Sequence, residues 1–324
     1  MSVRRHRKSI AVAAATVFAL LTQQALADGK YPVDTVNLIT LSKPGGGTDV
    51  YLREMSKYLH DMMGADFVVQ NVLGGSGAVA MAKTATARAD GGTLFGSTPT
   101  YVFTSLLSQP QVGYKDLQPV ANLFFDPQTI YVTADSPYHS LTDLIAASKK
   151  DPASVKFGVT NPGSMDRQII QQFEDLTGLT SPVVTNDGGG ELIISVLNHT
   201  VSCGTGEVQE LRGQMEAGKI RILATFTEQR LATLPDVPTA KEQGVDLVVD
   251  KFRGLVGPKG MPDEVVKAWE AAIPKILENP DFKKWYTDAD MIPAFMPHDQ
   301  YQAMIDQFAK EQHDAFVKNG LIAQ

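Results

Sequence analysis

Two glycine-rich turns contain the residue types best suited to hold a small charged ligand. Residues 44–49 read Pro-Gly-Gly-Gly-Thr-Asp and residues 74–78 read Gly-Gly-Ser-Gly-Ala, and each turn follows an apolar run. Glycine allows a backbone to approach a ligand closely, and the first N–H groups of a helix have no partner within that helix. The two turns therefore predict helix N-termini that can bind an anion.

Two further turns lie at similar positions relative to apolar runs. Residues 160–164 (Thr-Asn-Pro-Gly-Ser) follow a run that ends at Val159, and Ser164 is the expected N-cap of the next helix. Residues 186–190 (Asn-Asp-Gly-Gly-Gly) form a weaker example. In open α/β sheets, ligands bind beyond the carboxyl ends of strands, where such turns occur. We therefore expect several of these turns to line one site.

Two polar residues in the first turn have more than one reasonable role. Thr48 is suited to cap the helix that follows. Asp49 either interacts with the helix dipole in the first turn or accepts a hydrogen bond from the ligand. Sequence alone leaves both roles of Asp49 open.

Strand-like and helix-like segments alternate along the chain, which predicts an α/β protein with parallel or mixed sheets. An apolar stripe that begins at Val50 and stops at Gly64 indicates an amphipathic helix. Ser140 and Asp143 have the spacing of a capping box at the start of another helix. The predicted strands are 36–41, 67–72, 93–97, 129–134, 155–159, 182–185 and 220–226, and the other predicted helices are 141–148, 262–279 and 298–319.

The first 27 residues have the pattern of a cleavable export signal. A basic segment, 4–8, precedes the apolar residues 10–21 and a small-x-small site at 25–27. The apolar stretch has about 12 residues, whereas about 20 are needed to cross a bilayer. Cleavage after Ala27 removes four cations and no acid, which takes the formal charge from −7 to −11. We expect a periplasmic protein that neither binds nucleic acid nor inserts into a membrane.

Catalytic signatures are weak in this chain. It has neither a G-x-S-x-G elbow nor an H-E-x-x-H motif. Residues 75–80 match a dinucleotide-binding fingerprint, but Asp90 comes too early to be its acidic partner. The single cysteine, Cys203, lies in an apolar run and is expected to be buried. We therefore expect no catalytic residue, no metal ion and no cofactor.

Several short motifs occur in a specific order along the chain. They are residues 31–32, 44–49, 69–77, 89–94, 217–224, 234–239 and 242–244. In this order and spacing, the chain resembles the periplasmic solute-binding receptors of tripartite tricarboxylate transporters, often called Bug proteins. The resemblance covers essentially the whole chain after the export signal.

The resemblance implies the two-lobed fold of periplasmic binding proteins, similar to type II members. Two α/β lobes are joined by two crossing strands and close on a ligand like a Venus flytrap. By analogy, residues 28–124 and 251–324 form lobe 1, and residues 125–250 form lobe 2.

The resemblance also implies a small carboxylate ligand, held between the first glycine turn and a facing turn of lobe 2. Tyr101 and Phe252 either form an aromatic wall for the ligand or pack in the core. Arg167 either binds a second carboxylate or is a solvated helix residue. The candidate ligand-binding residues are Ser42, Gly46, Gly47, Thr48, Asp49, Tyr101, Thr160, Asn161, Gly163, Ser164, Arg167, Asp187 and Phe252.

The function implied by this resemblance is capture of a ligand, closure of the lobes and delivery to the membrane subunits of a transporter, by a monomer. Aliphatic di- and tricarboxylates, amino acids and aromatic carboxylates all remain open as ligands. The alternative functions are a secreted enzyme that acts on a carboxylate and a ligand-sensing receptor of a signalling system.

Overall fold

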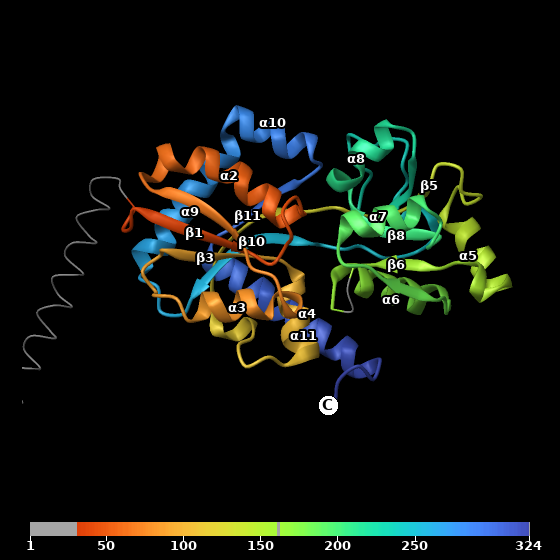
Figure 1. Ribbon diagram of the computed structural model, residues 1–324, viewed down its shortest axis with the longest axis horizontal. Helices are drawn as coiled ribbons and strands as arrows, with labels where there is room; N and C mark the ends of the chain where they lie inside the picture. Colours follow the sequence, from red (N-terminus) through yellow and green to blue (C-terminus); the bar gives the residue numbers. More distant parts are fainter. Residues whose placement is uncertain (1–30, 161–162, 324) are drawn as a thin grey trace, which may run out of the picture.

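Two α/β lobes lie side by side in the computed structural model, with extended segments crossing between them (Figure 1). The structure describes residues 31–160 and 163–323. The predicted export signal, residues 1–27, and the candidate residue Asn161 lie outside the described residues. Each lobe is built on one sheet that mixes parallel and antiparallel strands, so the expected two-lobed α/β fold is confirmed.

Lobe 1 contains a sheet of six strands within the described residues. In spatial order they are β11 (Ile292–Met296), β4 (Leu117–Phe125), β10 (Phe252–Pro258), β3 (Thr93–Ser97), β1 (Thr35–Thr40) and β2 (Asp66–Asn71). β1 runs parallel to β2 and β3, whereas β10 runs antiparallel to both β3 and β4. The helices of this part of the chain are α2 (Gly47–Met63), α3 (Ala78–Ala85), α4 (Pro99–Ser108), α9 (Asp263–Glu278), α10 (Pro280–Asp288) and α11 (His298–Lys318).

Lobe 2 contains a sheet of five strands, again counting only the described part of the chain. Their spatial order is β7 (Val183–Thr185), β6 (Phe157–Val159), β8 (Cys203–Glu207), β5 (Gln128–Thr133) and β9 (Ile220–Thr225). β6 runs parallel to β7 and β8, and β5 runs antiparallel to β8 and β9. The helices are α5 (Leu141–Lys150), α6 (Met165–Thr177), α7 (Gly189–Leu197) and α8 (Val208–Glu216). Short 3-10 turns are η1 (Gly75–Gly77), η2 (Tyr114–Asp116), η3 (Pro152–Ser154) and η4 (Lys241–Gln243).

The two segments that cross between the lobes are hydrogen-bonded to one another. Asp126 and Pro127 link β4 to β5, and residues 226–251 link β9 to β10. The Asp126 amide donates to the carbonyl of Lys251 at 2.8 Å. The Phe226 amide donates to the carbonyl of Gln128, also at 2.8 Å. These bonds form a two-stranded hinge. The exact lobe boundaries given above remain a prediction.

Helix boundaries follow the local signals in the sequence. α2 ends where Gly64 adopts a left-handed conformation with φ of 66°, which costs glycine little. The Ser140 hydroxyl accepts a hydrogen bond from the Asp143 amide at 3.1 Å at the start of α5. The Asp143 carboxylate accepts from the amide of His139 at 2.9 Å and also interacts with the amide of Ser140. The predicted N-cap and the reciprocal contact of a capping box are therefore both present.

The core of lobe 2 is completed by aromatic residues from helices of lobe 1. Phe103 of α4 and Phe316 of α11 are fully or almost fully buried in the same cluster as Phe157 and Phe173 of lobe 2. Asn319, just after α11, donates its side-chain amide to the Asp175 carboxylate of α6 at 3.1 Å. The C-terminal helix therefore connects the two lobes on one side.

The strands predicted from apolar runs are present within one or two residues of the expected limits. Four strands were not predicted: β4, β8, β10 and β11. They contain residues that weaken a strand pattern, such as Pro119 in β4 and Gly204 and Gly206 in β8. In the described part of the chain, no helix is both long enough and apolar enough to cross a bilayer.

Candidate functional site

A cleft of about 730 Å³ lies between the lobes. Among the described helices, six begin with residues that line it, at the N-cap or in the first turn: α2, α3 and α4 from lobe 1, and α6, α7 and α8 from lobe 2. The N-terminal end of a helix carries a partial positive charge and N–H groups that its own backbone does not use. The cleft therefore collects the anion-attracting ends of several helices in one place.

Most of the turn residues predicted from the sequence line this cleft. They are Ser42, Gly46, Gly47, Thr48, Thr160, Ser164 and Asp187. Ser164 is the N-cap of α6, as predicted, and its hydroxyl accepts a hydrogen bond from the Arg167 amide at 3.2 Å. The weaker turn at 186–190 also contributes, because residues 187–191 line the side formed by lobe 2.

Gly47 occupies a position where a larger residue has no room. A Cβ atom placed there would overlap the guanidinium group of Arg253. Gly46 is the N-cap of α2 and has an extended backbone that other residues can adopt. Side chains added at Gly46 would therefore test the cleft without imposing backbone strain.

Thr48 has another role than the one predicted, whereas Asp49 lies in the first turn of α2, as one of its two predicted roles requires. Thr48 does not cap α2, because Gly46 holds that position and the Thr48 hydroxyl accepts from Arg253 at 2.8 Å. The buried Asp49 carboxylate accepts from the amide of Gly45 at 2.9 Å and from Asn71 at 2.8 Å, and it pairs with Arg53. Burial raises the pKa of Asp49, but these bonds outweigh it and lower the pKa overall. Asp49 thus shapes the turn and is absent from the cleft lining.

The predicted aromatic wall is wrong for the residues named. Tyr101 is 1% exposed and Phe252 is fully buried, and their rings pack edge to face with centroids 6.3 Å apart. Neither residue lines the cleft. They lie in a core cluster because α4 packs its apolar face on β10 and α11, so the alternative of core packing is the one observed.

Arg167 and Gly163 also lie outside the cleft lining. One guanidinium nitrogen of Arg167 donates to the side-chain oxygen of Gln171 at 2.9 Å, one turn further along α6. This contact directs the group along its own helix, so the proposed binding of a second carboxylate has no support from the geometry.

A buried network of charged residues at the base of the cleft was missed by sequence reasoning. Arg253 donates through Nε and Nη2 to Asp126 Oδ2, at 2.8 and 2.6 Å. Its Nη2 also lies 2.9 Å from Glu207 Oε1, and Lys251 pairs with the same carboxylate. Arg253 is 2% exposed and Asp126 is 1% exposed. The signal that could have revealed the network is the pair of cations that flank Phe252 just before an apolar run.

The network favours the charged forms of Arg253 and Glu207. Burial lowers the pKa of Arg253, but the carboxylates of Asp126 and Glu207 raise it overall. Burial raises the pKa of Glu207, but Lys251 and Arg253 lower it overall. The network joins the hinge, α2 and lobe 2 through charged hydrogen bonds, which are stronger than neutral ones.

Glu210, the third residue of α8, is a further acid in the cleft that the sequence did not single out. Its Oε1 accepts from the Gly47 amide at 3.3 Å, across the gap between the lobes. Burial, followed by the nearby Glu207 carboxylate, raises the pKa of Glu210 to about 8. Within the described structure, Glu210 differs from Glu207 in having no cation as a hydrogen-bond partner.

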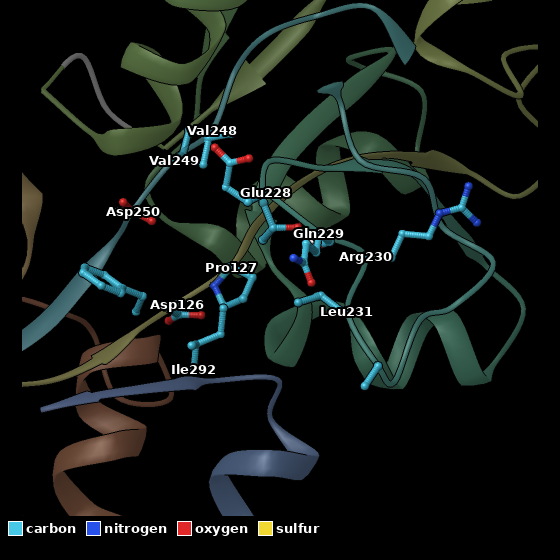
Figure 2. Close-up of a pocket in the computed structure, with 13 residues that line it drawn as sticks. Asp126, Pro127, Glu228, Gln229, Arg230, Leu231, Val248, Val249, Asp250 and Ile292 are labelled. Carbon is cyan, nitrogen blue, oxygen red and sulfur yellow. Dashed lines mark hydrogen bonds between the residues drawn. The ribbon is translucent and has the colours of Figure 1, made fainter. Parts of the chain in front are cut away.

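A second cavity of about 450 Å³ lies at the hinge (Figure 2). Asp126, Pro127 and Ile292 line one side, and Glu228, Gln229 and Leu231 line another, as Figure 2 shows. No described helix begins among its lining residues. The hinge cavity thus has no helix N-terminus to attract an anion, and we take the interlobe cleft as the candidate site.

No group of three or more His, Cys, Asp and Glu side chains in the described residues is arranged to hold a metal ion. Cys203 is fully buried in β8, as predicted, and burial raises the pKa of its thiol.

Comparison with known proteins places this geometry in context. The sequence model of the tripartite tricarboxylate transporter family receptor matches residues 51–321. The chain is similar to protein BugT of Bordetella pertussis, with 28% identity over 85% of this chain and 86% of that protein.

Solved structures have the same fold. A TctC solute-binding protein from Polaromonas, solved without ligand, has a TM-score of 0.71 and 26% identity, covering 89% of this chain and all of that one. A protein of R. palustris solved with adipate has a TM-score of 0.83 and 25% identity. That comparison covers 90% of this chain and 99% of the other.

Proposed function

Because the chain belongs to the tripartite tricarboxylate transporter family of receptors, we propose that it is a periplasmic receptor that captures a small carboxylate. The ligand enters the interlobe cleft, the lobes close over it by rotation at the hinge, and the closed form is presented to the membrane subunits of a transporter. The protein binds and releases its ligand unchanged and needs no cofactor.

The observation that carries this proposal is the meeting of six helix N-termini at one cleft. Such ends are suited to carboxylates because they offer N–H donors and a favourable dipole. The relative solved with adipate supports the same ligand class. The cleft volume of about 730 Å³ is large enough for a small organic acid.

We assign the ligand contacts to turn residues of both lobes. Ser42, Gly46 and Gly47 of lobe 1 lie across the cleft from Thr160 and Ser164 of lobe 2. A ligand carboxylate held between them would bring the lobes together, which couples binding to closure.

The proposal is tested by a thermal-shift screen of refolded, ligand-stripped protein. The probes are adipate, succinate, citrate and benzoate, each beside its amide. A ligand at about 100 times its dissociation constant adds roughly 2.7 kcal/mol to the free energy of unfolding, which raises Tm measurably. We expect a shift with at least one carboxylate and none with its amide. Equal shifts with acid and amide, or none with any acid, would refute carboxylate capture.

A pair of glycine variants tests the location of the site. Gly46→Leu places a side chain in the cleft at an extended backbone position, close to Ser42. Gly213→Leu is the matched control, because Gly213 is exposed on α8, away from the cleft lining, with open space around it. We expect Gly46→Leu to abolish the carboxylate shift and Gly213→Leu to retain it. An unchanged affinity of Gly46→Leu would show that the ligand binds elsewhere.

A further inference from the structure

We propose that Glu210 acts as a neutral acid whose carboxyl group donates its proton in a hydrogen bond to the ligand carboxylate. This inference rests on the proposed function and deepens it, because it makes carboxylate binding dependent on a proton. Glutamate side chains are usually ionised near neutral pH, so the inference needs a specific structural reason.

The first reason is the position of the Glu210 carboxyl group. Its Oε1 accepts from the Gly47 amide at 3.3 Å, at the first residue of α2 in lobe 1. Its other oxygen lies so close to Gly189, the first residue of α7 in lobe 2, that a Cβ atom there would overlap it. The carboxyl group thus lies between two helix N-termini of opposite lobes. A carboxylate captured at these same helix ends must lie next to Glu210.

The second reason is that the nearby cations already have partners. Arg253 is bound by Asp126 and Glu207, and Lys251 is bound by Glu207. Lys43 at the rim lies 3.9 Å from Asp187 and is largely exposed. An ionised Glu210 beside a ligand carboxylate would therefore place two like charges together without a neutralising cation. A shared proton removes this repulsion and forms a strong hydrogen bond.

Two other acids lie near Glu210, and each has partners of its own. Asp166 Oδ2 accepts from the amide and the hydroxyl of Thr160, at 2.8 and 2.5 Å, while burial raises the pKa of Asp166 overall. The Glu207 carboxylate is held ionised by its two cations. The titratable and charged groups that face Glu210 or the same cleft are Asp126, Tyr131, Glu207, Lys251 and Arg253, with Lys43, Asp166, Asp187 and Glu191 further along the lining.

The charge state of Glu210 agrees with this geometry. Burial and the neighbouring Glu207 carboxylate raise its pKa to about 8, against the opposing effect of Lys251 and Arg253. At pH 7 the empty protein therefore already holds the proton that the ligand needs. Above pH of about 8, binding must take up a proton from solution, and the affinity should fall about tenfold for each further pH unit.

Calorimetric titration with adipate tests the role of Glu210 directly. Wild type and Glu210→Gln are compared between about pH 7 and pH 9.5, each in two buffers of different ionisation enthalpy, which gives the number of protons bound. Gln keeps an N–H donor but cannot titrate. The matched control is Glu216→Gln, since Glu216 is an exposed acid at the end of the same helix, α8, and lies outside the cleft lining.

We expect the wild type and Glu216→Gln to lose roughly tenfold in affinity per pH unit above pH 8 and to take up close to one proton. Glu210→Gln should bind adipate with nearly the same affinity across this range and without proton uptake. A pH dependence that persists in Glu210→Gln would overturn the inference. So would a large gain in affinity of Glu210→Gln at pH 7, because it would indicate an ionised, repelling Glu210.

A measurement without ligand separates this inference from the proposed function. The ¹³C resonance of the Glu210 carboxyl group, identified by its loss in Glu210→Gln, should titrate with a midpoint near 8. A midpoint near the ordinary value of about 4.3 overturns the donor role alone, even if adipate binds. If no carboxylate binds to either protein, the proposed function fails and the donor role fails with it.

Discussion

Replacement of Arg253 with methionine should destabilise the protein strongly, because Arg253 is the centre of the buried charge network. Methionine retains much of the apolar stem but removes four hydrogen bonds, to Asp126, Glu207 and Thr48. The Asp126 carboxylate, 1% exposed, would then be buried without its cation. Removing one partner of a buried ion pair typically costs about 3–5 kcal/mol. We expect a loss in that range for Arg253→Met at pH 7.

Urea unfolding followed by circular dichroism measures this cost. The matched control is Lys284→Met, which breaks an exposed pair with Asp288 in α10 and should leave the free energy of unfolding almost unchanged. The double variant Arg253→Met with Asp126→Asn should recover part of the loss, because it removes the uncompensated charge. A cost for Arg253→Met as small as that of Lys284→Met would refute the reasoning, and so would a double variant less stable than the sum of its single changes.

Three further outcomes follow from the structure. Ser164→Ala removes the N-cap of α6 and should lower the free energy of unfolding by about 1 kcal/mol; urea unfolding measures this, and an unchanged midpoint contradicts the capping role. Cys203 is buried with a raised pKa, so a thiol reagent should modify it only at the rate of unfolding, and rapid modification of the native protein would contradict its placement. The pKa of Glu210 is about 8 in the folded state, which is higher than the ordinary pKa of a glutamate side chain. The contribution of Glu210 to the free energy of unfolding is therefore complete below that ordinary pKa and is lost as pH rises through 8. Urea unfolding should therefore give a free energy for wild type that falls between pH 5 and 9 by roughly 2–4 kcal/mol more than that of Glu210→Gln; parallel curves would exclude this linkage.

Local composition was sufficient to predict the strands that consist of short runs of apolar and β-branched residues. Residues 93–97 form β3 with the expected limits, and 36–41 differ from β1 by one residue at each end. β8 and β10 were not predicted because their glycines are required by close contacts with residues that are distant in the sequence. A Cβ at Gly204 would overlap the ring of Tyr131, and one at Gly254 would overlap Tyr301. These strands depend on close packing between distant segments, which a local pattern does not reveal.

The same distinction applies to the candidate site. Turn composition correctly placed Gly46, Gly47 and Ser164 at helix N-termini, because caps and glycine turns are local signals. The network of Asp126, Glu207 and Arg253 joins residues separated by up to 127 positions and could not be inferred from spacing. Tyr101 and Phe252 resembled ligand contacts by type alone, and the packing of α4 on β10 decided their burial.

The burial of Phe316 has a consequence for the order in which the protein folds. This residue lies near the end of the chain, yet it belongs to the apolar cluster that holds the helices of lobe 2 together. Lobe 2 therefore has a gap in its core until the last helix has been synthesised. Because α11 packs on α4 and also completes this cluster, we expect its docking to stabilise both lobes. A chain cut short before Phe316 should lose stability in both lobes at once.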